Sequence, residues 1–320
     1  MKRLFKPFPF SFIIKIIFKK LSNKMDNKSR SIEKIFTPPV VPEGDGARVR
    51  RIIGTSHLKK LDPFLMLDHF NARLPAGFPD HPHRGFETVT YLLSGTMYHE
   101  DFKGHKGIIN PGDCQWMTAG KGILHAEMPG SWDEPADGFQ LWINLPNKER
   151  YCDPQYQEIT KDKIPVVSKD NTTVKVIAGE SLGTKGPIYH RTPTFYLDVE
   201  MEANGKLEQL IPKNWNGFVY LYDGEIIIGP NEDKVGKNSV ALLKREEAET
   251  LIIKTKDSKA KFIIIAGQPL EEPVVQYGPF IAGTMEEIYH TFEDYQLGKN
   301  GFEGAMEWAS EIKNMSKKKK

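Results

Sequence analysis

The chain has 320 residues, of which 39% are hydrophobic and 27% are charged, so it is long enough for two globular domains of ordinary size. Its 44 basic residues nearly balance its 42 acidic ones, and this balance argues against direct sequence-specific binding to nucleic acid. The two cysteines, Cys114 and Cys152, argue against a disulfide framework and a sulfur-rich metal site and favour a reducing compartment.

The two ends of the chain differ in composition from the rest. An apolar stretch from Phe8 to Phe18 is interrupted by Pro9 and Lys15, and it falls well short of the ~20 residues that span a bilayer. We therefore expect no membrane span, and we interpret residues 1–27 as an N-terminal extension that is disordered or serves in targeting. At the other end, residues 316–320 are expected to form a lysine tail.

From Arg48 onward, short runs of β-branched and aromatic residues alternate with turn residues. The run at 88–93 precedes Ser94 and Gly95, and the turn at 110–113 precedes another run at 114–117. Frequent turns between such runs are typical of an all-β sandwich or barrel. Helices are expected only near the C-terminus, within residues 286–315.

The second half of the chain repeats the pattern of the first more loosely. Residues 218–225 resemble residues 89–96, because each apolar run ends at a turn glycine. This repetition predicts an internal duplication. We expect one domain over 28–160 and another over 161–315, joined by a polar linker at 161–171.

Four potential metal ligands occur as two pairs with the same spacing. His81 and His83 form one pair, and His125 and Glu127 form the other. Residues two apart on a strand project from the same face, so two adjacent strands can aim three imidazoles and one carboxylate at one point. Such donors suit iron, manganese, zinc, nickel or copper. The spacing therefore predicts a divalent-metal site.

Glu87 leaves the identity of the carboxylate ligand open. It lies four residues after His83, and it is an alternative fourth ligand to Glu127. In that case Glu127 would be an acid or general base beside the metal.

The other histidines have no comparable partner. His190 and His290 lie a hundred residues apart in the second half, so the metal site is expected in the first domain alone. The remaining histidines of the first half are expected to be surface or supporting groups; they are His57, His69, His99 and His105.

Several motifs resemble the pirin family. The similarity runs through 63–89, 110–120 and 122–129, which contain the two pairs, and it extends from about residue 34 to residue 308. Pirins belong to the cupin superfamily, so the resemblance implies a bicupin: two tandem cupin β-barrels with a short C-terminal helical segment. It also implies one non-haem iron ion, ferrous or ferric, held in the N-terminal barrel.

The resemblance assigns the ligand role to His81, His83, His125 and Glu127 and places Glu87 off the metal. Glu127 is then also a candidate catalytic base.

For function, the resemblance implies an iron-dependent, redox-sensitive transcriptional coregulator in the nucleus and cytoplasm. Its partner would be a transcription factor of the nuclear factor kappa B type or a coactivator. The resemblance also implies quercetin 2,3-dioxygenase activity, in which dioxygen opens a flavonol ring. The alternative is a dedicated flavonol-cleaving dioxygenase without a transcriptional role. The first 24 residues could redirect the protein within the cell.

Overall fold

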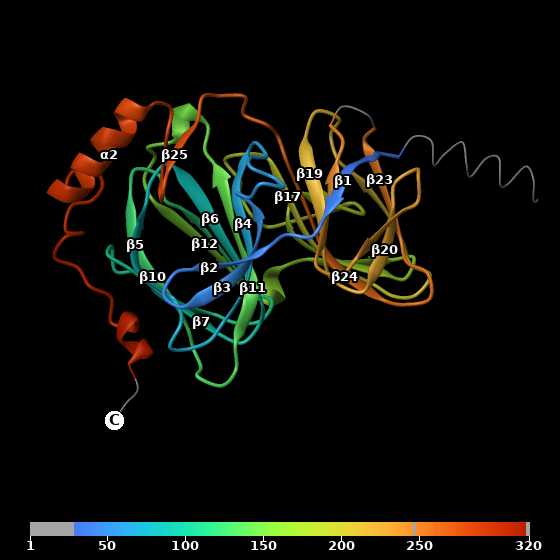
Figure 1. The fold of residues 1–320 in the computed structure, drawn as a ribbon, viewed down its shortest axis with the longest axis horizontal. Coiled ribbons are helices and arrows are strands. Elements are labelled where there is room, and N and C mark those ends of the chain that lie inside the picture. Colours follow the sequence, from blue (N-terminus) through green and yellow to red (C-terminus); the bar gives the residue numbers. More distant parts are fainter. Residues whose placement is uncertain (1–28, 246–247, 318–320) are drawn as a thin grey trace, which may run out of the picture.

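The computed structural model describes residues 29–245 and 248–317, which form two antiparallel β-barrels lying side by side (Figure 1). The predicted all-β architecture of two tandem barrels with a short C-terminal helical segment is confirmed. The expected N-terminal extension and the last three lysines lie outside the described residues. No helix among the described residues is both long and apolar enough to cross a membrane.

The N-terminal barrel consists of a seven-stranded sheet and a four-stranded sheet. The large sheet has the order β12-β9-β6-β11-β4-β3-β2, and the small sheet has the order β5-β10-β7-β8. The strands are β2 (Val40–Glu43), β3 (Ala47–Ile53), β4 (Phe64–Ala72), β5 (Phe78–His83), β6 (Phe86–Ser94), β7 (Met97–Asp101), β8 (Lys106–Ile109), β9 (Cys114–Thr118), β10 (Ile123–Pro129), β11 (Ala136–Asn144) and β12 (Gln155–Ile159).

The C-terminal barrel repeats this arrangement. Its large sheet has the order β1-β22-β19-β24-β17-β14-β13, and its small sheet has the order β18-β23-β20-β21. The strands are β1 (Ile32–Phe36), β13 (Val166–Lys169), β14 (Thr172–Ala178), β17 (Thr194–Met201), β18 (Lys206–Leu210), β19 (Asn216–Asp223), β20 (Glu225–Ile228), β21 (Asp233–Gly236), β22 (Ser239–Leu243), β23 (Thr250–Lys254) and β24 (Ala260–Gly267).

Smaller elements connect and cover the barrels. They are the strand pairs β15 (Glu180–Ser181) with β16 (Thr184–Lys185) and β25 (Val275–Tyr277) with β26 (Phe280–Ala282), the helix α2 (Met285–Leu297), and the 3-10 turns η1 (Asn147–Glu149), η2 (Lys161–Lys163) and η3 (Ile312–Ser316).

Both ends of the described chain cross to the other barrel, so the sheets differ from the predicted division at residue 160. Strand β1 lies within the range expected for the first domain, yet it pairs with β22 of the C-terminal barrel. Conversely, α2 and η3 follow the second barrel in sequence but lie against the first (Figure 1). By pairing with β22, β1 covers a sheet edge that would otherwise expose backbone groups.

The expected linker at 161–171 contains secondary structure. It includes η2 and β13, which pairs with β14 as the outer strand of the large C-terminal sheet. Three of the four β13 residues are exposed, because an edge strand has one neighbour and little cover. Its polar composition therefore reflects an edge strand rather than an irregular connection.

The two large sheets pack against each other through a shared apolar core. Val89 and Tyr91 of β6 belong to this core together with Phe218 of β19. Since side chains alternate along a strand, the intervening Thr88 and Thr90 face the interior of the N-terminal barrel. This alternation decides which polar residues of β6 can reach a site inside the barrel.

Helix α2 begins and ends at residues that favour helix termini. The Thr284 side chain accepts a hydrogen bond from the backbone N–H of Glu287, and Gly298 ends the helix in the left-handed conformation, with φ 60°. The buried Ile288 belongs to a small core with Phe280 and Phe302. The sequence break at Gly298 thus marks the end of a helix that is docked on the N-terminal barrel.

Arg30, just before β1, fastens the crossing segment to the C-terminal barrel. It is fully buried, and its guanidinium donates to the backbone carbonyls of Ile211, Pro212, Lys213, Trp215 and Ala248 at distances of 2.7–3.2 Å. One side chain therefore satisfies carbonyls in two loops, the one between β18 and β19 and the one between β22 and β23.

We predict that Arg30→Ala lowers the free energy of unfolding by about 3 kcal/mol, because buried carbonyls lose their donors and a cavity forms. Urea denaturation followed by circular dichroism measures this loss. Glu33→Ala, at an exposed position of β1, is the control and should change stability by less than about 0.5 kcal/mol. An Arg30→Ala variant as stable as wild type would contradict this role.

Candidate metal centre

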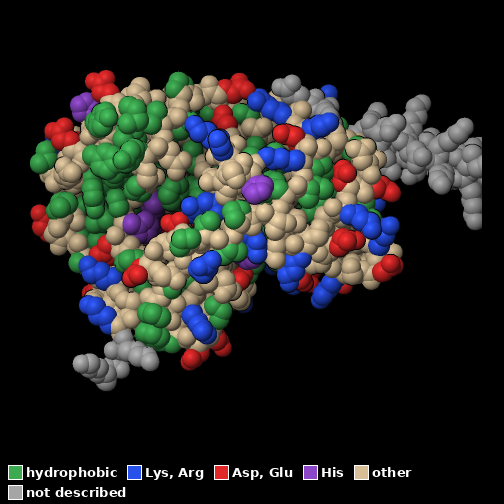
Figure 2. Space-filling model, in the orientation of Figure 1, with side chains coloured by type: hydrophobic (Ala, Val, Ile, Leu, Met, Phe, Trp, Pro, Cys, Tyr) green, Lys and Arg blue, Asp and Glu red, His purple; other side chains and the backbone are tan. Residues whose placement is uncertain are grey.

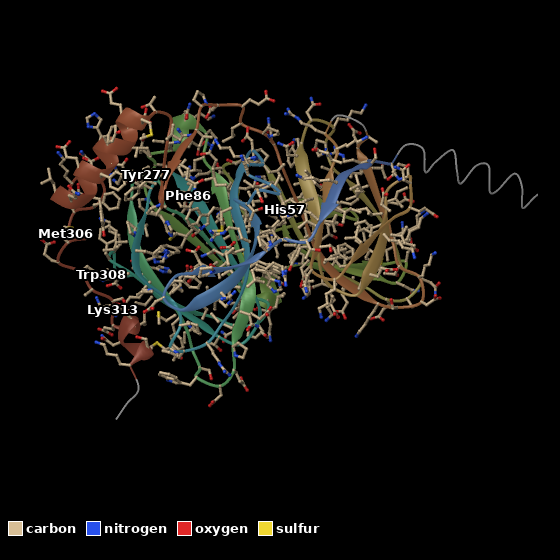
Figure 3. All side chains as sticks on the ribbon, in the orientation of Figure 1. His57, Phe86, Tyr277, Met306, Trp308 and Lys313 are labelled. Atoms are coloured by element: carbon tan, nitrogen blue, oxygen red, sulfur yellow. The ribbon has the colours of Figure 1, made fainter. Side chains whose placement is uncertain are left out.

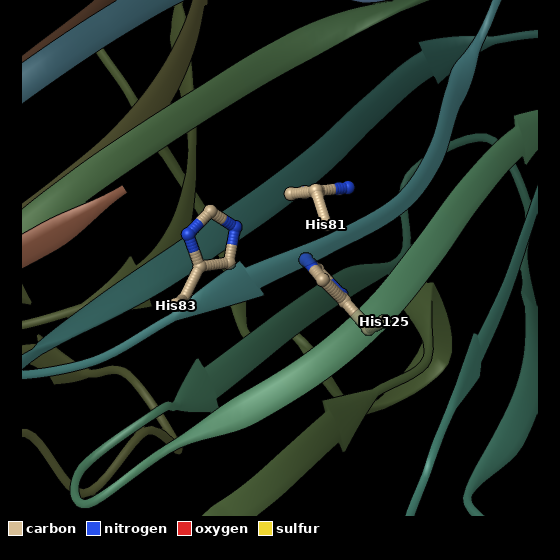
Figure 4. Close-up of side chains that lie close together, drawn as sticks. All are labelled: His81, His83 and His125. Carbon is tan, nitrogen blue, oxygen red and sulfur yellow. The ribbon is translucent and has the colours of Figure 1, made fainter. Parts of the chain in front are cut away.

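Three of the four predicted ligands meet inside the N-terminal barrel. His125 of β10 lies directly opposite His81 of β5, and His83 follows on the same face of β5. The ring centroid of His125 is 4.4 Å from that of His81 and 4.9 Å from that of His83. One ring nitrogen from each residue lies within 4.8 Å of the others, and the rings converge in Figure 4.

The hydrogen bonding of these histidines fits a bound metal. Nδ1 of His81 donates to the carbonyl of Pro79 at 2.8 Å, which leaves the lone pair of Nε2 free to bind a metal ion. Both ring nitrogens of His125, and Nδ1 of His83, are buried and have no hydrogen-bond partner among the described residues. Leaving such atoms unsatisfied costs about 1–3 kcal/mol each, and a metal ion would satisfy nitrogens from these rings.

Burial keeps the three imidazoles neutral. It lowers the pKa of His81, and it lowers the pKa values of His83 and His125 well below the ordinary value. For His83 and His125, a neighbouring histidine adds to this effect. Because metals bind the neutral form of histidine, the cluster is ready to act as a ligand set near neutral pH.

Glu127 projects from the same face of β10 as His125, but its carboxylate is held by neighbouring side chains. The Thr90 hydroxyl donates to Oε1 at 2.9 Å, and the Gln140 amide donates to Oε2 at 2.8 Å. The carboxylate is not part of the group formed by the three ring nitrogens. Burial raises the pKa of Glu127 to about 7, against the effect of the two hydrogen bonds. Its role as fourth ligand remains a prediction.

Glu87 lies on the opposite face of β6 from Thr88 and Thr90. It accepts a hydrogen bond from the Thr118 hydroxyl at 2.7 Å, on the face that β9 presents to the core between the barrels. Burial raises its pKa to about 7 as well. Of the two carboxylates left open by spacing, only Glu127 therefore projects into the barrel beside the histidines.

Aromatic rings line one side of the cluster. Phe86 and Trp142 each lie 5.1 Å from the ring of His83, and they also contact each other. The spacing of ligand residues did not identify Trp142. The feature that identifies it is its position in β11, where it pairs with Thr88 and therefore also faces the interior of the N-terminal barrel. These rings exclude water from His83.

The C-terminal barrel has a different interior. Its core is filled by aliphatic and aromatic side chains, among them Leu251, Ile253 and Phe262. His290 is exposed on α2, far in sequence from the half-buried His190. Among the described residues, the groups able to hold a metal ion lie in the N-terminal barrel.

The raised pKa of Glu127 gives its ligand role a measurable consequence. With a pKa of about 7, the carboxyl is largely protonated at pH 6, and it must lose that proton to bind a metal. We predict that Ni²⁺ binding at pH 6 releases about one proton fewer in Glu127→Gln than in wild type, with at least about tenfold weaker affinity. Calorimetry in buffers of different ionisation enthalpy measures both quantities.

Glu87→Gln is the matched control, because Glu87 has a similarly raised pKa but faces away from the histidines. It should retain wild-type proton release and affinity. Wild-type behaviour of Glu127→Gln would show that Glu127 is not a ligand.

Comparison with known proteins identifies the family. A family model described as pirin matches residues 46–143, and a model described as the pirin C-terminal cupin domain matches residues 196–301. Pirin from Rattus norvegicus is 55% identical over 85% of this chain and 94% of its own length. Pirin from Homo sapiens is 54% identical over the same shares.

Solved structures share the fold of this chain. A quercetin 2,3-dioxygenase from Acinetobacter baumannii has a TM-score of 0.77 and 30% identity, covering 86% of this chain and 99% of its own. A bacterial pirin from Escherichia coli, solved in complex with nickel(II), shares the fold with a TM-score of 0.60 and 18% identity, over 74% of this chain and 99% of its own. The chain therefore belongs to the pirin family, and its two domains have the cupin fold.

Proposed function

We propose that this chain is a non-haem iron protein whose metal centre acts as a redox-sensitive switch in transcriptional coregulation, in the nucleus and cytoplasm. The cofactor is one iron ion per chain, held by His81, His83, His125 and Glu127, although these donors also accept other divalent metals. The observation that carries the proposal is the arrangement of β5, which links the metal cluster to the surface.

The two faces of β5 have different partners. His81 and His83 point inward to the cluster, whereas Asp80 accepts hydrogen bonds from the Ser310 hydroxyl and, at 2.6 Å, from the Lys313 ammonium group. Both partners belong to the C-terminal segment around η3. The residue next to a metal ligand therefore holds a surface element.

Arg84 makes the corresponding link at the other end of β5. Directly after His83, its guanidinium donates to Asp294 of α2 at 2.8 Å and to the carbonyl of Asn300 at 2.6 Å. The ion pair with Asp294 is almost fully buried. Removing one partner of a buried ion pair costs about 3–5 kcal/mol, and we propose that this contact stays intact when His83 shifts, so that the movement reaches α2.

The elements held in this way carry apolar side chains on the surface. Hydrophobic groups gather over α2 and β25 in Figure 2, and the exposed ones include Tyr277, Met285, Tyr289 and Leu297. Figure 3 shows Met306, Trp308 and Lys313 further along the same side of the N-terminal barrel. An exposed group of apolar residues suits protein binding. We infer that this surface receives a transcription factor of the nuclear factor kappa B type or a coactivator.

A bound iron ion supplies a one-electron change of charge at the three histidines. The chain's own part is to convert a small movement of β5 into a movement of α2 and η3. A switch of this kind requires that the partner bind the two redox states with different affinity.

We predict that a purified transcription factor of this type binds the ferrous and ferric proteins with affinities that differ at least about fivefold. Asp80→Asn weakens the contact with Lys313 and should bring the two affinities together, without changing iron content. Lys237→Gln, which removes an exposed ion pair on the C-terminal barrel, is the control and should retain the difference. Calorimetric titration measures the three proteins in both redox states, and equal affinities in the two states of wild type would rule out the switch.

A second candidate function is cleavage of a flavonol by dioxygen. The similarity to the Acinetobacter baumannii quercetin 2,3-dioxygenase favours it. In this role the buried cluster would bind the metal, and Phe86 and Trp142 would exclude water. Glu127 would accept the proton of the flavonol 3-hydroxyl group.

The iron-loaded protein is then expected to consume oxygen in the presence of quercetin, and His81→Ala and His125→Ala should abolish the uptake. An oxygen electrode measures the rate, and iron content is determined on the same samples. If fully loaded wild type consumes no oxygen, the dioxygenase function is wrong and the switch is unaffected. If redox-dependent binding is absent as well, the metal serves only to stabilise the barrel.

A further inference from the structure

A second group of metal-binding side chains lies at the seam of the N-terminal barrel. There, β8 at the edge of the small sheet approaches β12 at the edge of the large sheet. The group consists of His99 from β7, His105 from the turn before β8, and Glu158 from β12, and one ligand atom of each lies within 4.8 Å of the others. None of these residues belongs to the three-histidine cluster.

The distances suit a metal ion bound by two imidazoles and a carboxylate. Nε2 of His99 is 2.7 Å from Oε1 of Glu158, and Nε2 of His105 is 3.9 Å from Oε2. Metal–ligand bonds of about 2.0–2.1 Å in a tetrahedron separate the ligand atoms by roughly 3.4 Å. The shorter contact is a hydrogen bond that a metal ion would replace, and small side-chain rotations would bring both distances to this value.

Gly107 provides the space in which these groups meet. A Cβ atom at this position would lie 2.3 Å from Nε2 of His99 and 2.9 Å from Oε1 of Glu158. Gly107 is not among the glycines with positive φ, so the backbone conformation does not require glycine there. What excludes any larger residue is the approach of His99 to Glu158.

Neighbouring side chains orient two of the three ligands. The ring of His105 stacks on Tyr156, with centroids 4.1 Å apart and planes 2° from parallel. Nδ1 of His105 is buried without a hydrogen-bond partner among the described residues, so stacking holds this ring. The Gln115 amide donates to Oε1 of Glu158 at 3.1 Å. A hydrogen bond such as that from Gln115 is typical of the surroundings of a carboxylate that binds a metal.

The group is also accessible. The His99 side chain is 1% exposed, whereas His105 is 34% and Glu158 is 44% exposed. One buried ligand and two half-exposed ligands leave a path from solvent and at least one open coordination position.

We propose that His99, His105 and Glu158 form a second metal site, specific for a divalent transition metal such as Zn²⁺. Two imidazoles and one carboxylate form a familiar zinc-binding set, with the fourth position occupied by water or a ligand. His99 lies directly opposite Glu127 in the pairing of β7 with β10, so the two metal sites share a wall of the barrel. The test must therefore distinguish a second site from replacement of metal in the first.

The test uses the full chain with the three-histidine site loaded with iron. After equilibrium dialysis against Zn²⁺, mass spectrometry of the metals should find one zinc ion in addition to the retained iron. His105→Ala removes a ligand, and Gly107→Ala fills the space between the ligands. Both variants should weaken zinc binding at least tenfold while retaining iron. His290→Ala removes an exposed histidine beside Glu286 and Glu293 and should retain the zinc.

Co²⁺ provides an independent signature, because a tetrahedral site gives it intense visible absorption that His105→Ala should abolish. Circular dichroism checks that each variant is folded. Zinc that replaces iron one for one would overturn the proposal. So would an iron-loaded wild type that binds no zinc, or a folded His105→Ala variant with undiminished zinc binding; in those cases the group is a hydrogen-bonded closure of the barrel seam.

Discussion

The alternation of side chains along β5 is the constraint on which the functional architecture depends. A strand has two faces, so a chain that directs His81 and His83 into the barrel must direct Asp80 and Arg84 outward. The outward residues fasten η3 and α2, which belong to the end of the chain and not to the N-terminal domain in sequence. The histidine cluster and the surface helix are thus attached to opposite sides of the same few residues, which is the basis of the proposed switch.

The two barrels have the same fold, but their interiors carry different side chains. In the C-terminal barrel the inward positions are apolar and form a closed core. In the N-terminal barrel the inward face of β6 and β11 carries Thr90 and Gln140, whose hydrogen bonds orient Glu127. Those hydrogen bonds offset part of the cost of burying a carboxylate. The N-terminal barrel also has a small apolar cluster, which includes Phe70, Leu92 and Met97, and the packing between the large sheets adds a larger apolar core.

Local pattern predicted an all-β sandwich or barrel and the convergence of the histidines, because turns and alternation with a period of two are short-range properties, whereas the two cupin barrels were implied by the family resemblance. The face of a strand on which a residue lies and the pairing of strands far apart in the sequence are not short-range properties. Nothing near Glu87 in the sequence tells which face of β6 it occupies; the packing of Val89 and Tyr91 against the other barrel decides that. Likewise, the sequence of β1 predicts a strand but not its pairing with β22 in the other barrel. His99 and Glu158 lie 59 residues apart, so no spacing could have revealed their contact.

The proposed iron site is defined by the atoms that bind the metal. X-ray absorption at the iron edge of the iron-loaded protein measures them directly. We expect a mononuclear site with three imidazole nitrogens and one carboxylate oxygen, the remaining positions being filled by water. A first shell with fewer than three imidazoles, or with sulfur, would contradict a site built from His81, His83 and His125.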